Sequence, residues 1–460
     1  MAAGDGKRLK SAIPKVLHEV SGKPLVVHVL AALAGIERAA TVLVASPRVD
    51  EIRTTVASHV SEDITYVVQE RPAGTADAAR LALEALPAEI RTVLIVPGDT
   101  PLVTGATLAS LLAAHRERGT ALTLLTASVL DPTGYGRVVR GAGDRVEAVV
   151  EDRDADERQR ALDEINAGVY VVELERLQAA LPKVGAENAQ TEYYLTDVVG
   201  LMAAEGDEVM AVATDAAETH GVNSRADLAR VEAAFRQRTC ERWMAEGVTI
   251  VDPATTYIDA SVDIGDDAVI RPFTFLEGAT SIGSGAEIGP HARVVDSSVA
   301  ARASISYAVV RGSTVGEEAS VGPFASLRPG TSLGARAHIG TFVETKAATI
   351  GDDSKANHLA YLGDAEIGSG VNVGAGTITC NWDGQDKHQT VIDDDAYIGS
   401  DTMLVAPVRV GKRAATGAGS VVRDDVPDDA LAIGVPARIV EGKGDKMGKK
   451  PGRPDGNEGG

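Results

Sequence analysis

A six-residue spacing of aliphatic side chains in the second half of the chain constrains the fold more than any other feature. Ile, Leu or Val, and once Thr, returns at every sixth position in three runs: Ile264, Ile270, Leu276, Ile282, Ile288 and Val294; Val315, Val321, Leu327, Leu333 and Ile339; and Ile392, Ile398, Leu404, Val410, Thr416 and Val422. A period of six fits neither an α-helix nor a plain series of hairpins. It is typical of a parallel β-helix, in which each hexapeptide makes one strand and one corner and the aliphatic side chain points inward. An ordinary β domain with scattered Val-Gly pairs is the less favoured interpretation.

The first half of the chain has a different organisation. Short apolar runs at 41–45, 64–69, 92–96 and 122–127 alternate with helical stretches such as 76–86 and 107–118. This alternation predicts a mostly parallel sheet with helices on both faces, which binds ligands beyond the carboxyl ends of its strands. We expect this α/β domain at 1–222, a linker helix within 223–247, the β-helix at 248–440 with a projecting loop at 380–389, and a disordered tail at 441–460.

Charge and composition exclude several functions. The net charge is -21, which disfavours nucleic acid as a partner, although a small phosphorylated ligand needs only a few local cations and backbone N–H groups. The two cysteines, Cys240 and Cys380, lack metal-ligand spacing and fit a reducing compartment. The chain has neither an apolar run of the roughly 20 residues that cross a bilayer nor a signal-peptide pattern. These features predict a cytoplasmic protein that does not insert into membranes.

A Gly-rich turn opens the chain, as Ala2-Ala3-Gly4-Asp5-Gly6-Lys7-Arg8, and Lys15 follows it. Small residues leave backbone N–H groups free to approach phosphates, and the basic side chains supply positive charge. A Gly-x-Gly sequence alone is a weak signal that a plain turn explains equally well. Here it is accompanied by Gln69-Glu70-Arg71-Pro72-Ala73-Gly74-Thr75, Pro97-Gly98-Asp99 and Gly134-Tyr135-Gly136-Arg137.

These motifs, in that order, resemble sugar-nucleotide pyrophosphorylases, and most closely the bifunctional N-acetylglucosamine-1-phosphate uridylyltransferase/glucosamine-1-phosphate acetyltransferase (GlmU) family. Lys15-Val16-Leu17-His18, Glu164-Ile165-Asn166-Ala167-Gly168 and Gly221-Val222-Asn223 add to the resemblance, which runs from Met1 to about Val440. It implies a Rossmann-like nucleotidyltransferase domain followed by a left-handed β-helix that associates as a homotrimer. It also implies synthesis of UDP-N-acetylglucosamine for cell-wall precursors from UTP, acetyl-CoA and glucosamine 1-phosphate, with Mg²⁺ as cofactor.

For the first half, the resemblance implies a role for each matching residue. Arg8 and Lys15 would neutralise charge on the phosphates during attack, and Asp99 and Asn223 would hold Mg²⁺, whose shell phosphates and water complete. The residues implied in binding UDP-N-acetylglucosamine are Ala2, Ala3, Gly4, Lys15, Gln69, Gly74, Thr75, Gly136, Glu151, Asn166 and Asn223. Without the resemblance, Asp99 would be taken for a strand-end cap and Glu151 for a solvated charge.

The second half carries motifs that resemble the acetyltransferase of the same family, including Phe342-Val343-Glu344-Thr345-Lys346 and Asn357-His358-Leu359-Ala360-Tyr361. The resemblance implies that His358, with Glu344 as an orienting partner, removes a proton from the amine that attacks acetyl-CoA. It implies Arg328, Lys346, Tyr361, Asn372, Asn381 and Trp382 in binding the acceptor sugar phosphate, and Ala375, Asn381, Trp382, Ser400 and Ala418 in binding acetyl-CoA, between subunits. Trp382 replaces an expected Tyr, and Val435 replaces an Arg, for which Arg438, Lys412 or the tail lysines are candidate substitutes.

The resemblance leaves three alternatives. Related enzymes have a short apolar strand before the Gly-rich turn, where this chain has Met1, so one alternative is an acetyltransferase whose uridylyltransferase half is impaired. The others are a nucleotidyltransferase with a purely structural β-helix, and a non-enzymatic relative. The clustered Arg328, Lys346 and His358 argue against the first of these two, and Lys15, Asp99 and Asn223 argue against the second.

Overall fold

A computed structural model describes residues 1–4 and 6–443, and the chain divides into two compact units, Met1–Phe235 and Arg236–Gly460. The last part of the predicted tail, 444–460, lies outside the described residues. Within the described residues, no helix combines the length and apolarity needed to span a bilayer.

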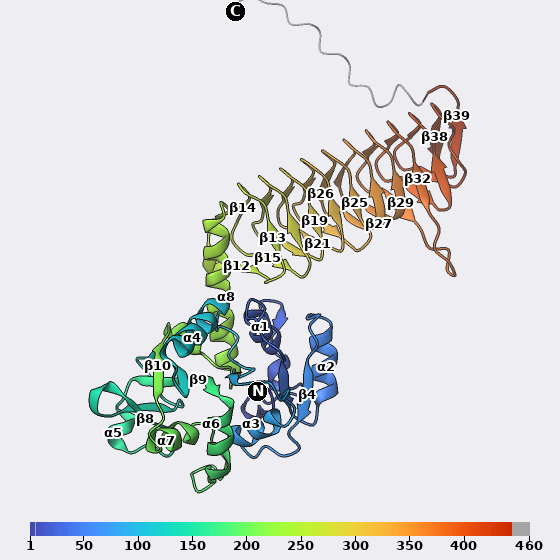
Figure 1. Cartoon of the computed structure of the whole chain (residues 1–460). Helices are drawn as coiled ribbons and strands as arrows, with labels where there is room; N and C mark the ends of the chain where they lie inside the picture. Colours follow the sequence, from blue (N-terminus) through green and yellow to red (C-terminus); the bar gives the residue numbers. More distant parts are fainter. Residues whose placement is uncertain (5, 444–460) are drawn as a thin grey trace, which may run out of the picture. The chain divides into compact units, whose positions relative to one another are not determined.

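The first unit is an α/β domain in which helices and strands alternate along the chain (Figure 1). In order, its elements are η1 (Lys7–Leu9), η2 (Lys15–Leu17), β1 (Glu19–Val20), β2 (Lys23–Pro24), α1 (Leu25–Ala32), β3 (Val42–Ala45), α2 (Val49–Ala57), β4 (Thr65–Val68), α3 (Thr75–Leu83), β5 (Thr92–Ile95), α4 (Gly105–Arg118), β6 (Leu122–Ser128), β7 (Arg137–Arg140), η3 (Ala142–Asp144), β8 (Val146–Val150), α5 (Glu157–Arg160), β9 (Glu164–Glu173), α6 (Leu174–Ala180), η4 (Leu181–Lys183), α7 (Asp197–Ala204), β10 (Val209–Ala213) and η5 (Ala216–Thr219). The four predicted strands are present as β3, β4, β5 and β6, and the two predicted helices as α3 and α4.

The strands form a mixed arrangement. β3 pairs with β4 in parallel, and a separate sheet has the order β10-β6-β9-β7-β8, with β5 also paired to β9. The prediction of a mostly parallel sheet is wrong for this second sheet: β9 runs antiparallel to β5, β6 and β7, and β8 runs antiparallel to β7. The regular alternation of one strand with one helix stops at β6, and the short connection from β7 to β8 joins two antiparallel neighbours.

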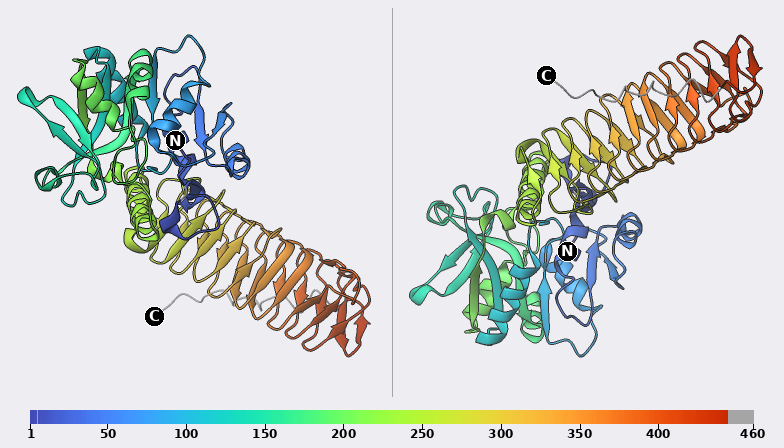
Figure 2. Two further views of the ribbon diagram at one scale, coloured as in Figure 1. Left: turned by 90° about the horizontal axis from the view of Figure 1, so that it is seen from below. Right: turned by 90° about the horizontal axis from the view of Figure 1, so that it is seen from above.

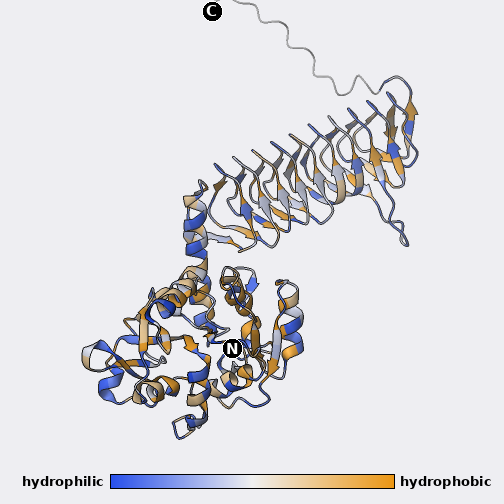
Figure 3. Ribbon diagram, in the orientation of Figure 1, coloured by the Kyte–Doolittle hydropathy of each residue, from blue (hydrophilic) through white to orange (hydrophobic). Residues whose placement is uncertain are grey.

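Helices cover both faces of β3. Leu43 and Ala45 pack with Val26 and Leu30 of α1, whereas Val44 packs with α3. Successive side chains of a strand point to opposite faces, so α1 and α3 lie on opposite sides of this strand. Figure 3 shows α1 in the orange of apolar residues, as expected of a helix buried against the sheet.

The second unit is the predicted parallel β-helix, with flat strands stacked one coil above another (Figure 2). Ile264 pairs with Ile282 and Ile270 with Ile288, eighteen residues or three hexapeptides further along. In later coils the offset shortens, as in the pairing of Val294 with Val310, which explains why the six-residue spacing slips between its first two runs. The inward aliphatic side chains form one continuous core.

The strands of the coil belong to two hydrogen-bonded sheets. One consists of β11 (Thr249–Ile250), β14 (Val269–Ile270), β17 (Glu287–Ile288), β20 (Ser304–Ile305), β23 (Ser320–Val321), β26 (His338–Thr341), β28 (Lys355–His358), β30 (Asn372–Val373), β33 (Tyr397–Ile398), β36 (Ala415–Thr416), β38 (Leu431–Gly434) and β39 (Ala437–Val440). The other consists of β12 (Thr256–Ile258), β13 (Asp263–Ile264), β15 (Thr274–Glu277), β16 (Ser281–Ile282), β18 (Arg293–Val295), β19 (Ser298–Val299), β21 (Val309–Arg311), β22 (Thr314–Val315), β24 (Ser326–Leu327), β25 (Ser332–Leu333), β27 (Glu344–Ile350), β29 (Tyr361–Ile367), β31 (Ile378–Cys380), β32 (Thr390–Ile392), β34 (Met403–Val405), β35 (Val408–Val410) and β37 (Val421–Val422). The predicted loop projects between β31 and β32 (Figure 1).

The predicted linker helix is α8 (Arg225–Ala245), and its last turns belong to the second unit. There Cys240 and Trp243 join the aliphatic core of the coil, and the backbone N–H of Val248 donates to the carbonyl of Trp243 at 2.9 Å. The helix end therefore closes the first coil of the β-helix.

We expect Trp243→Ala to destabilise the β-helix by about 3–5 kcal/mol, because it removes a side chain that is 5% exposed and leaves a cavity. Met244→Ala is the matched control, since its side chain is 39% exposed and should change stability by at most about 0.5 kcal/mol. Calorimetric unfolding of the full chain measures both. Equal effects of the two variants would show that α8 does not cap the coil.

Candidate active sites

A cavity of about 520 Å³ in the first unit gathers most of the predicted residues of this half. It lies where β4, β5 and β8 end, the edge at which ligands bind in α/β sheets. Its walls include Ala2, Ala3, Gly4, Arg8, Lys15, Gln69, Gly74, Thr75, Asp99, Glu151, Asn166 and Asn223. Gly136 lies beside it, because its carbonyl accepts a hydrogen bond from the backbone N–H of Asn166 at 2.9 Å.

Lys15 lies between the two residues predicted to hold a metal. Its Nζ donates to Oδ1 of Asn223 at 2.7 Å and forms an ion pair with Asp99. The two oxygen donors are also held together by backbone, since the N–H of Val222 donates to the carbonyl of Asp99 at 2.9 Å. A positive group therefore already stands where an Asp carboxylate and an Asn carbonyl converge.

The start of α8 fixes Asn223. The Oδ2 atom of Asp227 accepts hydrogen bonds from the backbone N–H groups of Asn223, at 3.1 Å, and of Ser224, at 2.8 Å. In return, the N–H of Asp227 donates to Oγ of Ser224 at 3.2 Å. This reciprocal cap satisfies backbone donors at the helix start and holds the preceding residue in place.

The Gly-rich turn is anchored by backbone hydrogen bonds. The N–H of Ala2 donates to the carbonyl of Val44, and the N–H of Gly98 donates to that of Met1, both at 2.7 Å. Gly6 has φ +60°, and a Cβ there would lie 2.8 Å from Cβ of Lys15. Glycine at this position therefore lets the turn approach Lys15.

The segment around Gln69 forms another wall. Nε2 of the buried Gln69 donates to the carbonyl of Gly74 at 3.1 Å and to Oδ2 of Asp77 at 2.8 Å. Oγ1 of Thr75 accepts from the N–H of Leu195 at 2.9 Å, and the N–H of Ala76 donates to the carbonyl of Tyr193 at 2.9 Å. These bonds fix the turn, but they also use the hydrogen-bond donors of the Gln69 amide nitrogen.

The third wall holds Glu151 and Asn166. Burial raises the pKa of the Glu151 carboxyl, although Thr196 partly offsets this by donating from Oγ1 at 3.1 Å. Nδ2 of Asn166 donates to the hydroxyl of Tyr170 at 2.6 Å. Thr196 and Tyr170 were missed in the sequence because they lie in no glycine-rich motif; the apolar run around Tyr170 gave only a strand signal.

We expect Gly74→Ala to destabilise the first unit by about 2–3 kcal/mol, because the new Cβ would be strained at φ +117° and would lie 2.3 Å from the carbonyl oxygen of Tyr193. Gly119→Ala is the control: it has φ +64° but open space around a Cβ, so only about 1 kcal/mol of backbone strain is expected. Thermal unfolding distinguishes them. Equal destabilisation would mean that the contact with Tyr193 does not hold this turn.

In the β-helix, His358 and three small residues lie at equivalent positions in successive coils, and we call this set the His358 column. Thr341 pairs with His358, and the register of Lys355 with Asn372 places Ala375 beside His358 in the next coil. Backbone hydrogen bonds join the same position in the following coils. The N–H of Asp401 donates to the carbonyl of Ala375 at 2.6 Å, and the N–H of Gly419 donates to the carbonyl of Ser400 at 2.8 Å. Ala375, Ser400 and Ala418 thus occupy equivalent corners of successive coils.

The predicted acceptor-binding side chains lie on the adjoining strands. Glu344 pairs with Tyr361 and Lys346 with Gly363 across β27 and β29. Nη1 of Arg328 donates to Oε1 of Glu344 at 2.8 Å, so Arg328 is a partner of the carboxylate predicted to orient His358. Asn372 begins β30, one coil beyond Lys355.

The projecting loop adds further groups. Nδ2 of Asn381 donates to Oδ2 of Asp364. The backbone of Trp382, whose side chain is exposed, forms an isolated antiparallel β-bridge with that of Lys387. The nearby Lys387 ammonium lowers the pKa of Lys346. Lys387 was missed because a lysine in a polar loop has no distinguishing pattern. Among the candidate substitutes for the Arg expected at Val435, Lys412 forms an ion pair in which its Nζ lies 3.4 Å from Oδ2 of Asp394. The tail lysines Lys446, Lys449 and Lys450 lie outside the described residues.

Together, the fold and the two groups of side chains define a nucleotidyltransferase-type α/β domain joined to a hexapeptide-repeat β-helix. Residues 1–167 match the MobA-like NTP transferase domain family. The chain is 49% identical over 439 residues to the bifunctional protein GlmU of Streptomyces avermitilis, covering 94% of this chain and 90% of the relative. It is 48% identical over 460 residues to that of Thermobifida fusca, covering 99% and 94%, and 48% identical over 457 residues to that of Kineococcus radiotolerans, covering 99% and 92%.

The chain belongs to the GlmU family. It is a bifunctional enzyme with uridylyltransferase and acetyltransferase activities, and the comparisons do not favour the acetyltransferase-only alternative.

Proposed function

We propose that the β-helix transfers an acetyl group from acetyl-CoA to the amine of glucosamine 1-phosphate, and that the first unit then transfers uridylyl from UTP to the N-acetylglucosamine 1-phosphate formed, releasing pyrophosphate. The observation that carries the second step is the convergence of Lys15, Asp99 and Asn223 in one cavity. UDP-N-acetylglucosamine, a precursor of cell-wall polymers, is the product.

In the uridylyl transfer, the sugar phosphate attacks the α-phosphorus of UTP and pyrophosphate leaves, so negative charge must be stabilised without a covalent intermediate. Arg8 and Lys15 line the cavity and supply positive charge. Asp99 and Asn223 provide the hard oxygen donors that Mg²⁺ prefers, and phosphates complete the shell of such a site. When bound, Mg²⁺ neutralises the phosphates, and we expect Lys15 to move from Asp99 onto a phosphate.

The other walls select the substrate. Gln69, Gly74 and Thr75 are proposed to hold the uracil base, while Gly136, Glu151 and Asn166 hold the acetamido sugar. Glu151 and Asn166 both lie on the cavity wall and are kept in position by Thr196 and Tyr170. Ala2, Ala3 and Gly4 bring the backbone close to the nucleotide.

We expect Asp99→Asn to lower kcat/KM for pyrophosphate release by about 10²–10³-fold and to raise the Mg²⁺ concentration required, because a charged metal ligand is lost. Acetyl transfer, measured as CoA release, should not change. Asp50→Asn is the control, since the side chain of Asp50 is 90% exposed. Unchanged pyrophosphate release in Asp99→Asn, at every Mg²⁺ concentration, would reject this role.

In the acetyl transfer, the amine of glucosamine 1-phosphate must lose a proton before it can attack the thioester, and the imidazole of His358 accepts it. The nearby cations Arg328 and Lys346 are proposed to bind the sugar phosphate, with Tyr361, Asn372, Asn381 and Trp382 around the sugar. The corner column of Ala375, Ser400 and Ala418 leaves room for acetyl-CoA beside Asn381 and Trp382. Lys387 joins Lys346 as a second cation of the acceptor site.

His358→Ala should reduce CoA release by about 10²–10⁴-fold, the range contributed by a general base. Pyrophosphate release from UTP and N-acetylglucosamine 1-phosphate should stay at the level of the unmodified chain, because that site lies in the other unit. The two rates are compared in one preparation. A parallel fall of both, in a variant with unchanged unfolding temperature, would contradict separate active sites.

We further propose that the β-helix assembles as a homotrimer, with acetyl-CoA bound between subunits. In support, an exposed stack of rings follows the corner next to the His358 column: Phe273, His291, Tyr307, Phe324 and Phe342, with centroids 4.8–5.7 Å apart between neighbours. Such an exposed apolar ridge is typical of a protein contact.

The cytoplasm is the proposed compartment, since Cys240 and Cys380 are free thiols.

A further inference from the structure

Gly136 lies between two residues that are proposed to hold the acetamido sugar. The next residue, at the start of β7, pairs in antiparallel register with the last residue of β8 and with the second residue of β9. This register places Gly136 level with Glu151 on one side and with Asn166 on the other. A Cβ at Gly136 would lie 3.6 Å from Oε1 of Glu151 and 3.8 Å from Cβ of Asn166. Three segments of the chain therefore meet beside the 520 Å³ cavity.

The side chain of Arg137 joins two of these segments, and only 2% of it is exposed. Its Nη1 donates to the carbonyl of Tyr135, the residue before Gly136. Its Nη2 donates to Oδ1 of Asp152, the residue after Glu151, at 3.0 Å. One buried guanidinium therefore fixes the separation between the turn that precedes β7 and the segment that follows β8.

Arg137 is not among the described residues that line the 520 Å³ cavity. Both of its terminal nitrogens donate to protein groups, one on each of the segments that it joins. Arg137 can therefore influence a bound substrate only through the groups that it holds in place.

Packing alone does not account for an arginine at this buried position. The Nε atom of Arg137 has no hydrogen-bond partner among the described residues, so one donor of a buried charged group is unused. Burial of a charge costs free energy, and a buried ion pair often adds nothing to stability compared with apolar side chains of similar volume. What the guanidinium supplies is geometry, because it is planar and donates in fixed directions.

We propose that Arg137 is a positioning residue for the sugar phosphate, which holds Gly136 and Glu151 at the separation that N-acetylglucosamine 1-phosphate requires. The inference rests on the proposed uridylyl transfer, in which these two residues contact the acetamido sugar. The uracil base is assigned to a different wall of the cavity, so the binding of UTP should not depend on Arg137.

Arg137→Met removes both hydrogen bonds and keeps an unbranched side chain. We expect KM for N-acetylglucosamine 1-phosphate to rise roughly tenfold or more, because displaced groups no longer meet the sugar. KM for UTP should change by less than about twofold, as expected for a distant site. Pyrophosphate release, measured against each substrate in turn, gives both values. Arg137→Lys keeps the charge but not the planar fork, so it should restore only part of the loss.

Asp152→Ala cuts the same link at its other end. The side chain of Asp152 is 27% exposed, so its loss disturbs folding less than the loss of the buried arginine. KM for the sugar phosphate should again rise while KM for UTP stays unchanged. Combining this substitution with Arg137→Met should add little to either single effect, because both remove one interaction. Additive effects on KM for the sugar phosphate would overturn the proposal.

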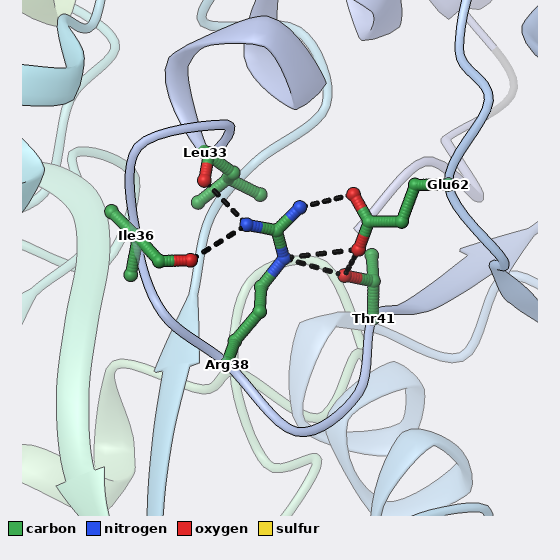
Figure 4. Close-up of polar contacts among 5 residues, drawn as sticks. All are labelled: Leu33, Ile36, Arg38, Thr41 and Glu62. Atoms are coloured by element: carbon green, nitrogen blue, oxygen red, sulfur yellow. Dashed lines mark hydrogen bonds and ion pairs between the residues drawn. The ribbon is translucent and has the colours of Figure 1, made fainter.

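Arg38 provides a matched control in the same unit (Figure 4). Its guanidinium has the same kinds of partner, since Nη1 donates to the carbonyl of Ile36 at 2.8 Å and Nε donates to Oε1 of Glu62 at 3.1 Å. Arg38 is likewise absent from the described lining of the 520 Å³ cavity. Arg38→Met should therefore lower the unfolding temperature without changing KM for either substrate.

The expected result is a rise in KM for the sugar phosphate alone in Arg137→Met and Asp152→Ala, and no such rise in Arg38→Met. Equal changes of both KM values in Arg137→Met, or the same selective rise in Arg38→Met, would overturn the role of Arg137 and leave the proposed function intact. Absence of pyrophosphate release in the unmodified chain would instead overturn the proposed function, and this inference with it.

Discussion

The backbone hydrogen bonds of Met1 and Ala2 to Val96, Gly98 and Val44 are the interaction on which the arrangement of the first unit depends. They are direct links between the β3–β4 pair and the sheet that contains β5. They also set the position of the Gly-rich turn that follows, and so the distance from that turn to Lys15. Losing them would separate the walls of the nucleotide cavity as well as the two sheets.

Electrostatics distinguishes the two sites. In the first, the ammonium of Lys15 is partly buried against Asp99 and Asn223, so a substrate must compete for an existing ion pair. In the second, Lys346 lies near Lys387, whose ammonium group lowers the pKa of Lys346, and the charge of Asp364 only partly opposes this effect. An anionic ligand relieves that repulsion, which suits capture of a sugar phosphate from solution.

The repeating part of the fold could be predicted in detail from the sequence, because every coil obeys the same rule: Ile264, Ile282 and their successors must point inward wherever the repeat continues. The site residues, such as Asp99 and His358, were predicted from motifs that resemble a known family, because neither residue type nor spacing alone distinguishes them from ordinary surface residues. The reversal of β9 and the cation Lys387 were not predicted. Each depends on contacts between segments far apart in the chain, which leave no periodic signal.

A crystal structure of the full chain with UTP and Mn²⁺ tests the uridylyltransferase site most directly, since Mn²⁺ can replace Mg²⁺ at oxygen ligands and is located by its anomalous scattering. We expect an anomalous peak in contact with the Asp99 carboxylate and the Asn223 carbonyl oxygen, with Nζ of Lys15 moved onto a phosphate. A nucleotide bound in the cavity while Lys15 still pairs with Asp99, and with no peak beside Asn223, would contradict the account.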